Sequence, residues 1–127
     1  MSKLVISAIG PASSVQDAGR PGAQRYGLTP SGAMDRLGLA AANCLAGNAL
    51  FAPAIEIGPY GAAFKAREGT VRVAMAGTPR AAEIGGRTVA WDTSLTIADG
   101  ETLTMLFPFP TLKRGGSMFC REDEISP

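Results

Sequence analysis

The sequence predicts a mainly β fold with one α-helix. Apolar residues recur at helical spacing in a single stretch, which begins near Thr29 and ends near Asn48. Elsewhere, short apolar or alternating segments are separated by turns that contain glycine and proline, as is typical of strands. A chain of 127 residues can build one hydrophobic core, so we expect one domain or part of one.

The N-terminal region combines one strand with a long ordered loop. Leu4 to Ala8 form an apolar strand candidate, which Gly10-Pro11 ends because proline cannot continue a strand ladder. From Ser13 to Ser31, glycines and prolines are mixed with polar residues and form no repeat. This composition favours fixed turns over a flexible linker.

The predicted helix opens at Thr29-Pro30-Ser31, where the Ser31 side chain can cap the first turn. Asp35 then falls in the first turn, where the positive end of the helix dipole favours a carboxylate. Gly47-Asn48 ends the helix, since glycine readily adopts the left-handed conformation. The apolar residues at helical spacing are Met34, Leu37, Ala41, Ala42 and Leu45.

The second half is predicted to be a β-meander without a second long helix. Two hairpins are expected, at Gly85-Gly86 and at Asp99-Gly100, because both dipeptides tolerate positive φ angles. Phe107-Pro108-Phe109-Pro110 ends a strand, and Gly115 to Phe119 is typical of the start of another. The other strand candidates are Ala54 to Ile57, Ala62 to Lys65, Val71 to Met75, Ala82 to Ile84, Arg87 to Val89, Leu95 to Ala98 and Thr102 to Phe107.

Composition narrows the function classes. The net charge is +1 and no basic run exceeds Lys113-Arg114, which argues against a nucleic-acid partner. No apolar run approaches the roughly 20 residues that span a bilayer, and the first ten residues do not form a signal peptide, so we expect a cytoplasmic protein without a membrane partner.

Two cysteines and the absence of histidine limit the chemistry further. Cys44 and Cys120 lie in unlike surroundings and form no C-x-x-C pair, which favours a reducing compartment. Without histidine, a self-contained Ser-His-Asp or Cys-His site is excluded, and no metal site is expected. Acid–base chemistry would fall to Asp17, Asp35, Glu56, lysines, tyrosines or a partner.

The polar loop contains the first candidate site. Gln16, Asp17, Arg20 and Arg25 could bind an anion or a carboxylate, because arginine presents a planar pair of donors to such groups. Alternatively, an internal Asp–Arg pair ties the loop together. The glycines of this loop match neither a P-loop nor a dinucleotide fingerprint.

The helix and the strand that follows contain the remaining candidates. Ser31 to Asp35 could present free N–H groups and an adjacent carboxylate to a ligand, and the Asp35 carboxylate suits a ligand amide or ammonium better than an anion. Alternatively, this segment is an ordinary capped helix start. Asn43 lies nearly opposite the apolar stripe, where it would bond to loop backbone. Glu56 alternates with Ile55 and Ile57 and should face solvent unless a pocket lies on that face.

Several motifs together resemble a known family. V-Q-D-A-G-R-P-G, P-S-G-A-M-D-R, A-N-C-L-A-G-N and A-I-E-I-G occur in order and at matching spacing. They are similar to the N-terminal part of the biotin-dependent carboxyltransferase family. That family includes the C subunit of 5-oxoprolinase, the second subunit of urea carboxylase/allophanate hydrolase systems, and the antagonist of a sporulation-kinase inhibitor. The resemblance extends from about Leu4 to Phe119.

The resemblance implies a cyclophilin-like β-barrel lobe, here incomplete, that works with a B-like partner of similar fold and an A-like partner. It implies ATP-dependent hydrolysis of 5-oxoproline to glutamate, or alternatively carboxyl transfer from carboxybiotin to urea, or a non-catalytic interaction role. ATP is then used by the whole complex, and biotin enters only in the urea alternative. Positions of this chain that match the family's motifs include Gly19, Gly27, Gly32 and Asn48, and those expected to bind substrate are Gln16, Asp17, Arg20, Ser31, Met34, Asp35, Asn43 and Glu56.

The C-terminal end departs from the family pattern. We expect residues 1–119 to form the N-terminal lobe of a carboxyltransferase-type domain, and residues 120–127 to be a non-matching tail. Members of the family continue into a second lobe where this chain has Cys120 to Pro127. The hypothesis is therefore a truncated or frameshifted fragment that is inactive in isolation, with no catalytic residue assigned.

Overall fold

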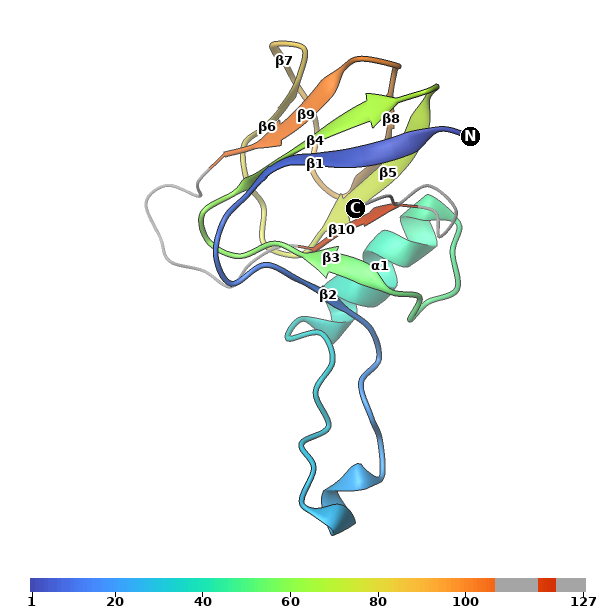
Figure 1. Ribbon diagram of the computed structural model, residues 1–127, viewed down its shortest axis with the longest axis vertical. Coiled ribbons are helices and arrows are strands. Elements are labelled where there is room, and N and C mark those ends of the chain that lie inside the picture. Colours follow the sequence, from blue (N-terminus) through green and yellow to red (C-terminus); the bar gives the residue numbers. More distant parts are fainter. Residues whose placement is uncertain (107–116, 121–127) are drawn as a thin grey trace.

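Two five-stranded antiparallel sheets pack face to face, and one helix covers the outer side of one of them (Figure 1). This arrangement is taken from a computed structural model, which describes residues 1–106 and, for the backbone, 117–120. In these described residues the fold is mainly β with a single α-helix, as the sequence predicts. Within the described residues the sheets remain separate and do not close into a barrel.

The first sheet has the strand order β1-β4-β9-β6-β7. Its strands are β1 (Lys3–Ile9), β4 (Ala62–Arg67), β9 (Thr102–Met105), β6 (Ala82–Ile84) and β7 (Arg87–Thr88). The register of β1 on β4 shifts between Ile6 and Ala8. The hairpin predicted at Gly85-Gly86 is confirmed, because Ile84 pairs with Arg87 across it.

The second sheet has the strand order β2-β3-β10-β5-β8. Its strands are β2 (Ser14–Gln16), β3 (Ala54–Glu56), β10 (Ser117–Cys120), β5 (Val71–Ala76) and β8 (Thr93–Ile97). The sequence places β2 in the loop, because three residues carry too little pattern to indicate a strand. The strand predicted to start in Gly115 to Phe119 is confirmed as β10, which lies in the middle of the sheet.

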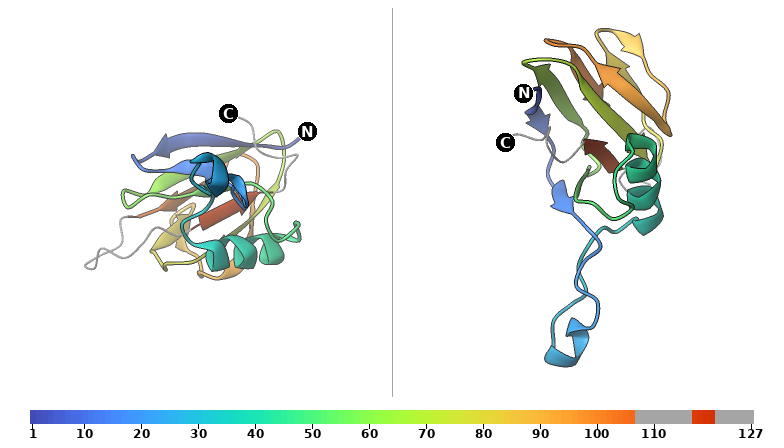
Figure 2. Two further views of the ribbon diagram at one scale, coloured as in Figure 1. Left: turned by 90° about the horizontal axis from the view of Figure 1, so that it is seen from below. Right: turned by 90° about the vertical axis from the view of Figure 1, so that its right-hand side faces the viewer.

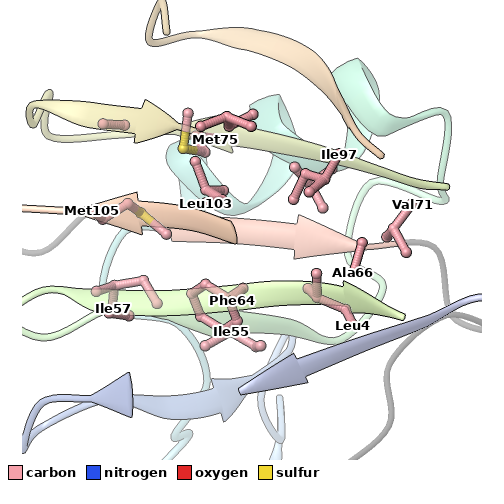
Figure 3. Packing of buried hydrophobic residues seen from close by; sticks show 14 residues of the cluster. Leu4, Ile55, Ile57, Phe64, Ala66, Val71, Met75, Ile97, Leu103 and Met105 are labelled. Atoms are coloured by element: carbon pink, nitrogen blue, oxygen red, sulfur yellow. The ribbon is translucent and has the colours of Figure 1, made fainter. Parts of the chain in front are cut away.

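Side chains from both sheets meet in one apolar core (Figure 3). Phe64 and Leu103 project from the first sheet, and Met75 and Ile97 project from the second, all with no exposed surface. Burial of this apolar area, at about 25 cal/mol per Å² removed from water, is what holds the two sheets together. In β4 the buried residues alternate with more exposed ones, as the predicted period of two requires.

The turn at Asp99-Gly100 does not form the hairpin that the sequence predicts. Strand β8 pairs with β5, whereas β9 pairs with β4 and β6, so the turn carries the chain from one sheet to the other. The N–H of Gly100 donates to the carbonyl of Ala66 on β4 instead of closing a ladder between β8 and β9. The dipeptide does form a tight turn, but the same crossing between sheets makes the prediction of a simple meander wrong.

Helix α1 (Arg36–Ala46) covers the outer face of the second sheet, against β5, β10 and β8. It ends before Gly47, as predicted, with Gly47 at φ 83°. Its N-cap is Asp35, four residues after the predicted cap Ser31, because Ser31 and Gly32 have φ angles of 53° and 89°, which a right-handed helix cannot contain.

The buried stripe of α1 also differs from the predicted one. It consists of Gly38, Leu39, Ala42, Asn43 and Ala46. Leu37, which the spacing assigns to the core, is 84% exposed, and Met34 precedes the helix and is 70% exposed. Small side chains face the sheet because the helix packs closely on Ala76 of β5. A prediction based on the spacing of the large apolar residues therefore assigned the wrong helix face to the core.

Other predictions fall outside the described residues. These are the strand end at 107–110 and the charged segment at 121–127. In the part of the chain that the structure describes, no helix has the length and apolar character needed to cross a bilayer.

Candidate functional site

Residues 17–33, here called the arm, leave the sandwich and project well beyond it (Figures 1 and 2). The arm contains most of the polar loop that the sequence analysis selected. Its tip is a short 3₁₀ helix, η1 (Ala23–Tyr26), which buries none of its residues. Within the arm only Ala33, at its base, is buried in an apolar cluster. Contacts of the arm's own backbone must therefore determine the shape of the rest.

The two legs of the arm meet at Gly19 and Gly32, which have φ angles of 81° and 89°. A Cβ on Gly19 would overlap the carbonyl oxygen of Pro30, and a Cβ on Gly32 would lie 2.8 Å from the Gly19 nitrogen. The contact between the legs, residues 19–20 and 30–32, is here called the neck of the arm. Across the neck, the N–H of Arg20 donates to the Pro30 carbonyl at 2.6 Å. Only glycine combines this conformation with this close approach.

Side chains at the neck add further hydrogen bonds. Asp17 Oδ1 accepts the N–H of Gly19 at 2.8 Å, and Arg20 Nη2 donates to Ser31 Oγ at 3.1 Å. Among the described residues Asp17 forms no ion pair with Arg20 or Arg25. The Asp–Arg tie considered as an alternative is therefore wrong, because the aspartate bonds to backbone and the arginine to a serine.

Glu56 of β3 lies beneath the returning leg of the arm. Its carboxylate accepts the N–H of Met34 at 3.1 and 3.2 Å and the N–H of Asp35 at 3.3 Å. On the other side, Arg36 Nη1 donates to the carbonyl of Ala18 at 2.7 Å. Glu56 is half-buried against the arm, so the expectation that it faces solvent is wrong, and the arm is attached to both the sheet and the helix.

Asp35 is the N-cap of α1 and occupies the role that the sequence analysis gives to Ser31. Its Oδ1 accepts the N–H of Gly38 at 2.8 Å. Ser31 instead bonds to Arg20 within the arm. Aspartate is as good a cap as serine, and the predicted capping position was wrong because the preceding residues turn into the arm.

Asn43 is fully buried in α1, and not opposite the buried face as the spacing suggests. Its Nδ2 donates to the carbonyls of Leu50 at 3.3 Å and Ala52 at 3.0 Å, and its Oδ1 accepts from Asn48 Nδ2 at 3.2 Å. The expected bonding to loop backbone is confirmed. Asn43 fixes the loop between α1 and β3, away from the arm.

The eight residues predicted to bind substrate therefore have different surroundings. Glu56, Asp35, Met34, Asp17, Arg20 and Ser31 lie along the arm and its base, whereas Asn43 does not, and Gln16 bonds to Ser14 Oγ at 2.9 Å on β2. Most of their polar atoms bond to the protein itself. The six residues along the arm and its base thus build and orient the arm.

An open depression of about 400 Å³ lies between the start of α1 and the end of β5. Asp35, Leu37 and Ala41 line it from the helix, and Thr78 and Asp92 line it from the facing loops. No sequence motif marks Thr78 or Asp92 as a site residue, since each stands alone in a turn. Only the packing of α1 on β5 brings them to Asp35.

Arg80 is a third residue that the sequence motifs do not indicate. It is only 7% exposed, and it donates from Nη1 to the Gly58 carbonyl at 2.6 Å and from Nη2 to the Ile57 carbonyl at 3.0 Å. Burial lowers the pKa of its guanidinium from the ordinary value, since a buried cation is poorly solvated. Arg80 joins the turn after β5 to the residues that follow β3.

The described residues contain no group of three histidine, cysteine or carboxylate side chains that could hold a metal ion. The chemistry that the site offers is thus carboxylates on the depression, guanidinium groups on the arm, and exposed apolar side chains next to both.

Comparison with known proteins identifies the family. A model of the carboxyltransferase domain, subdomain A and B, matches residues 26–114. This chain belongs to that family. The matched residues begin at the tip of the arm and include α1, the depression and most of both sheets, whereas Gln16, Asp17 and Arg20 precede them.

Individual relatives agree with this assignment. The chain is 52% identical over 44 residues to the C subunit of 5-oxoprolinase from Haemophilus influenzae, a match that covers 35% of this chain and 14% of that protein. The crystal structure of TTHA0988 superimposes with a TM-score of 0.81 at 27% identity, covering 92% of this chain and 43% of that one. The chain therefore spans less than half of either relative.

A yeast enzyme has the same carboxyltransferase-domain fold. The Kluyveromyces lactis urea carboxylase superimposes with a TM-score of 0.83 at 28% identity, and the superposition covers 93% of this chain and 10% of that enzyme. Almost the whole chain thus corresponds to one part of a much larger protein.

Proposed function

We propose that this chain is a carboxyltransferase-domain component of a 5-oxoprolinase, equivalent to part of the C subunit of that enzyme. In this role it would act with A-like and B-like partners in the ATP-dependent opening of 5-oxoproline to glutamate. The observation that carries the proposal is the 52% identity over 44 residues to the C subunit of a 5-oxoprolinase. This match covers 35% of the chain, whereas the 27–28% identity to the structural neighbours extends over 92–93% of it.

The neck of the arm supplies the group best suited to the substrate. 5-Oxoproline carries a carboxylate, and a guanidinium binds a carboxylate through paired hydrogen bonds. Arg20 is exposed, and its backbone N–H and Nη2 are both fixed, to Pro30 and to Ser31. We assign to Arg20 the substrate carboxylate and to Asp17, Ser31, Asp35 and Glu56 the positioning of the arm.

ATP fits the described site poorly. Asp35 and Asp92 both line the depression, and two carboxylates repel the phosphate groups of a nucleotide. The loop glycines also lack a phosphate-binding fingerprint. The proposal therefore places ATP on one of the partners, and no step of the reaction is routed through this chain's own carboxylates.

The test is reconstitution of the complex. This chain is co-expressed with the A-like and B-like partners, and 5-oxoproline-dependent release of ADP and glutamate is measured. We expect turnover by the complex, none by the chain alone, and a loss of at least about tenfold in kcat/KM for Arg20→Met.

The matched control for Arg20→Met is Arg67→Met, which removes an exposed arginine at the end of β4 and should leave kcat/KM unchanged. Turnover by the isolated chain contradicts the proposal, and so does a complex whose release of ADP does not depend on 5-oxoproline. If the Arg20→Met and wild-type complexes are equally active, only the role given to Arg20 is contradicted, and the proposed function is not.

The urea carboxylase relationship supports one alternative. The Kluyveromyces lactis urea carboxylase and urea amidolyase both superimpose with a TM-score of 0.83. In that case this domain would take part in carboxyl transfer from carboxybiotin to urea, with biotin held by another component. Urea-dependent rather than 5-oxoproline-dependent ADP release in the same reconstitution would favour this alternative.

A further inference from the structure

The tip of the arm exposes large side chains to solvent. Tyr26 is 72% exposed and Leu28 is 48% exposed, and the Arg25 guanidinium lies 4.8 Å from the centre of the Tyr26 ring. Tyrosine and arginine, together with tryptophan, are enriched among the residues that contribute most to binding energy at protein interfaces. Placed together on a projecting tip, they form a convex surface that requires a concave acceptor.

The arm is also basic and already ordered. From Arg20 to Ser31 the sequence contains two arginines and no acidic residue. The contacts between Gly19, Gly32 and Pro30 hold the two legs together, so little conformational freedom remains to be lost on binding. An acceptor for this tip should be hollow, partly apolar and acidic.

The depression beside α1 has these properties. Its volume of about 400 Å³ is within the usual range for a binding pocket, roughly 300–1,000 Å³. Leu37, which is 84% exposed, and Ala41 give it an apolar wall, and Asp35 and Asp92 give it two carboxylates. Asp92 forms no ion pair with any other described residue.

The tip does not fill the depression of its own chain. The arm runs away from the sandwich in both perpendicular views (Figures 1 and 2). Its base is fixed by Glu56 and Arg36, so the whole arm would have to detach in order to fold back. The two complementary surfaces of one molecule are thus available to another.

We propose that the tip of the arm of one copy docks in the depression of a second copy, and that the exchange is reciprocal. Arg25 then faces Asp92 of the other copy, and Tyr26 and Leu28 lie against its Leu37. A two-fold axis relates the two contacts, so each interaction occurs twice, as in most homodimers. The proposal concerns self-association and does not depend on the reaction that the domain serves.

Charge reversal tests the proposed pairing. The oligomeric state is measured by light scattering and analytical ultracentrifugation across a wide range of protein concentration. We expect a concentration-dependent dimer, and at least about tenfold weaker association for Arg25→Glu and for Asp92→Arg. Arg67→Glu and Asp99→Arg reverse exposed charges away from both surfaces and should leave the dimer unchanged.

A mixture of the two reversed chains provides the decisive measurement. In a heterodimer of Arg25→Glu with Asp92→Arg, one contact pairs Glu with Arg and the other retains the original Arg25 and Asp92. We therefore expect the mixture to recover the dimer, which native mass spectrometry identifies as mixed. Asp92→Asn removes the charge alone and should weaken the dimer less than Asp92→Arg, which separates charge from strain at the φ of 54° of Asp92.

Three results would overturn the proposal. The first is a monomer at every concentration. The second is a dimer that survives both charge reversals, which would place the interface elsewhere. The third is a mixture that stays monomeric although each reversed chain retains the unfolding transition of the wild type.

Discussion

The carboxylate of Glu56 binds the backbone N–H of Met34 through both of its oxygens, at 3.1 and 3.2 Å. Glu56 is the last residue of β3, and Met34 is where the arm returns to the body. One side chain of the sheet therefore fixes the end of the arm and the approach to the N-cap Asp35, whose N–H it also accepts.

Glu56→Ala should loosen the arm and lower the free energy of unfolding. The substitution removes a partly buried acceptor from two N–H groups, so we expect a loss of about 1–3 kcal/mol by urea denaturation. Trypsin should also cut after Arg25 faster, because a loosened arm enters the protease more readily.

Two variants separate the causes of the Glu56 effect. Glu56→Gln keeps one oxygen acceptor and should lose less stability than Glu56→Ala. Glu83→Gln, on β6, changes a half-buried strand glutamate whose side chain makes no hydrogen bond to the described residues, and it should behave as the wild type. If Glu56→Ala leaves both stability and cleavage unchanged, Glu56 does not hold the arm.

Gly19→Ala should destabilise the neck more than Gly22→Ala does. Both glycines have a φ of 81°, so both variants carry the cost of a left-handed alanine, about 1–2 kcal/mol. At Gly22 a Cβ meets nothing within 4 Å, whereas at Gly19 it overlaps the backbone of Pro30 and Ser31. The difference in unfolding free energy between the two variants measures the close approach alone, and equal losses would contradict a tight neck.

Much of the fold was predictable because it depends on local pattern. The period of two indicates β5, the Gly85-Gly86 dipeptide indicates the hairpin, and Gly47 indicates the end of α1. The prediction of a hairpin at Asp99-Gly100 was wrong because a dipeptide indicates the local conformation and not which strands pair on either side of it. That choice depends on contacts with β4 and β5.

The candidate site was less predictable, since its residues act through distant partners. The sequence identifies Asp17, Arg20 and Glu56 as polar residues in a motif, but not that Glu56 reaches the backbone of Met34. The predicted buried face of α1 was wrong at Leu37, because small residues and Asn43 pack on the sheet while the Leu37 side chain remains exposed.

Asn43→Asp should be more damaging than Asn43→Ala. Alanine leaves the carbonyls of Leu50 and Ala52 without their donor and should lower the free energy of unfolding by about 1–3 kcal/mol. Aspartate is nearly isosteric, but it buries a negative charge against those same carbonyls and should be worse above its pKa.

The pH dependence provides the check for Asn43. Because burial raises the pKa of a carboxyl, the stability of Asn43→Asp should recover as pH falls and the carboxyl takes up a proton. The wild type serves as the reference at each pH. A variant as stable as Asn43→Ala at neutral pH would indicate that position 43 is open to water.

Arg80 should contribute to stability through its two carbonyl bonds, although it buries a cation. Arg80→Ala removes both donors and leaves space, so we expect a loss of about 2–4 kcal/mol in urea denaturation. Arg80→Met fills most of that space and removes the desolvated charge, so it should lose less.

For comparison, Arg87→Ala breaks an exposed ion pair with Glu101 and should cost less than about 1 kcal/mol. The order wild type, Arg80→Met, Arg80→Ala supports the role of the guanidinium as a donor to Ile57 and Gly58. A methionine variant more stable than the wild type would instead mean that burying the cation costs more than its two hydrogen bonds return.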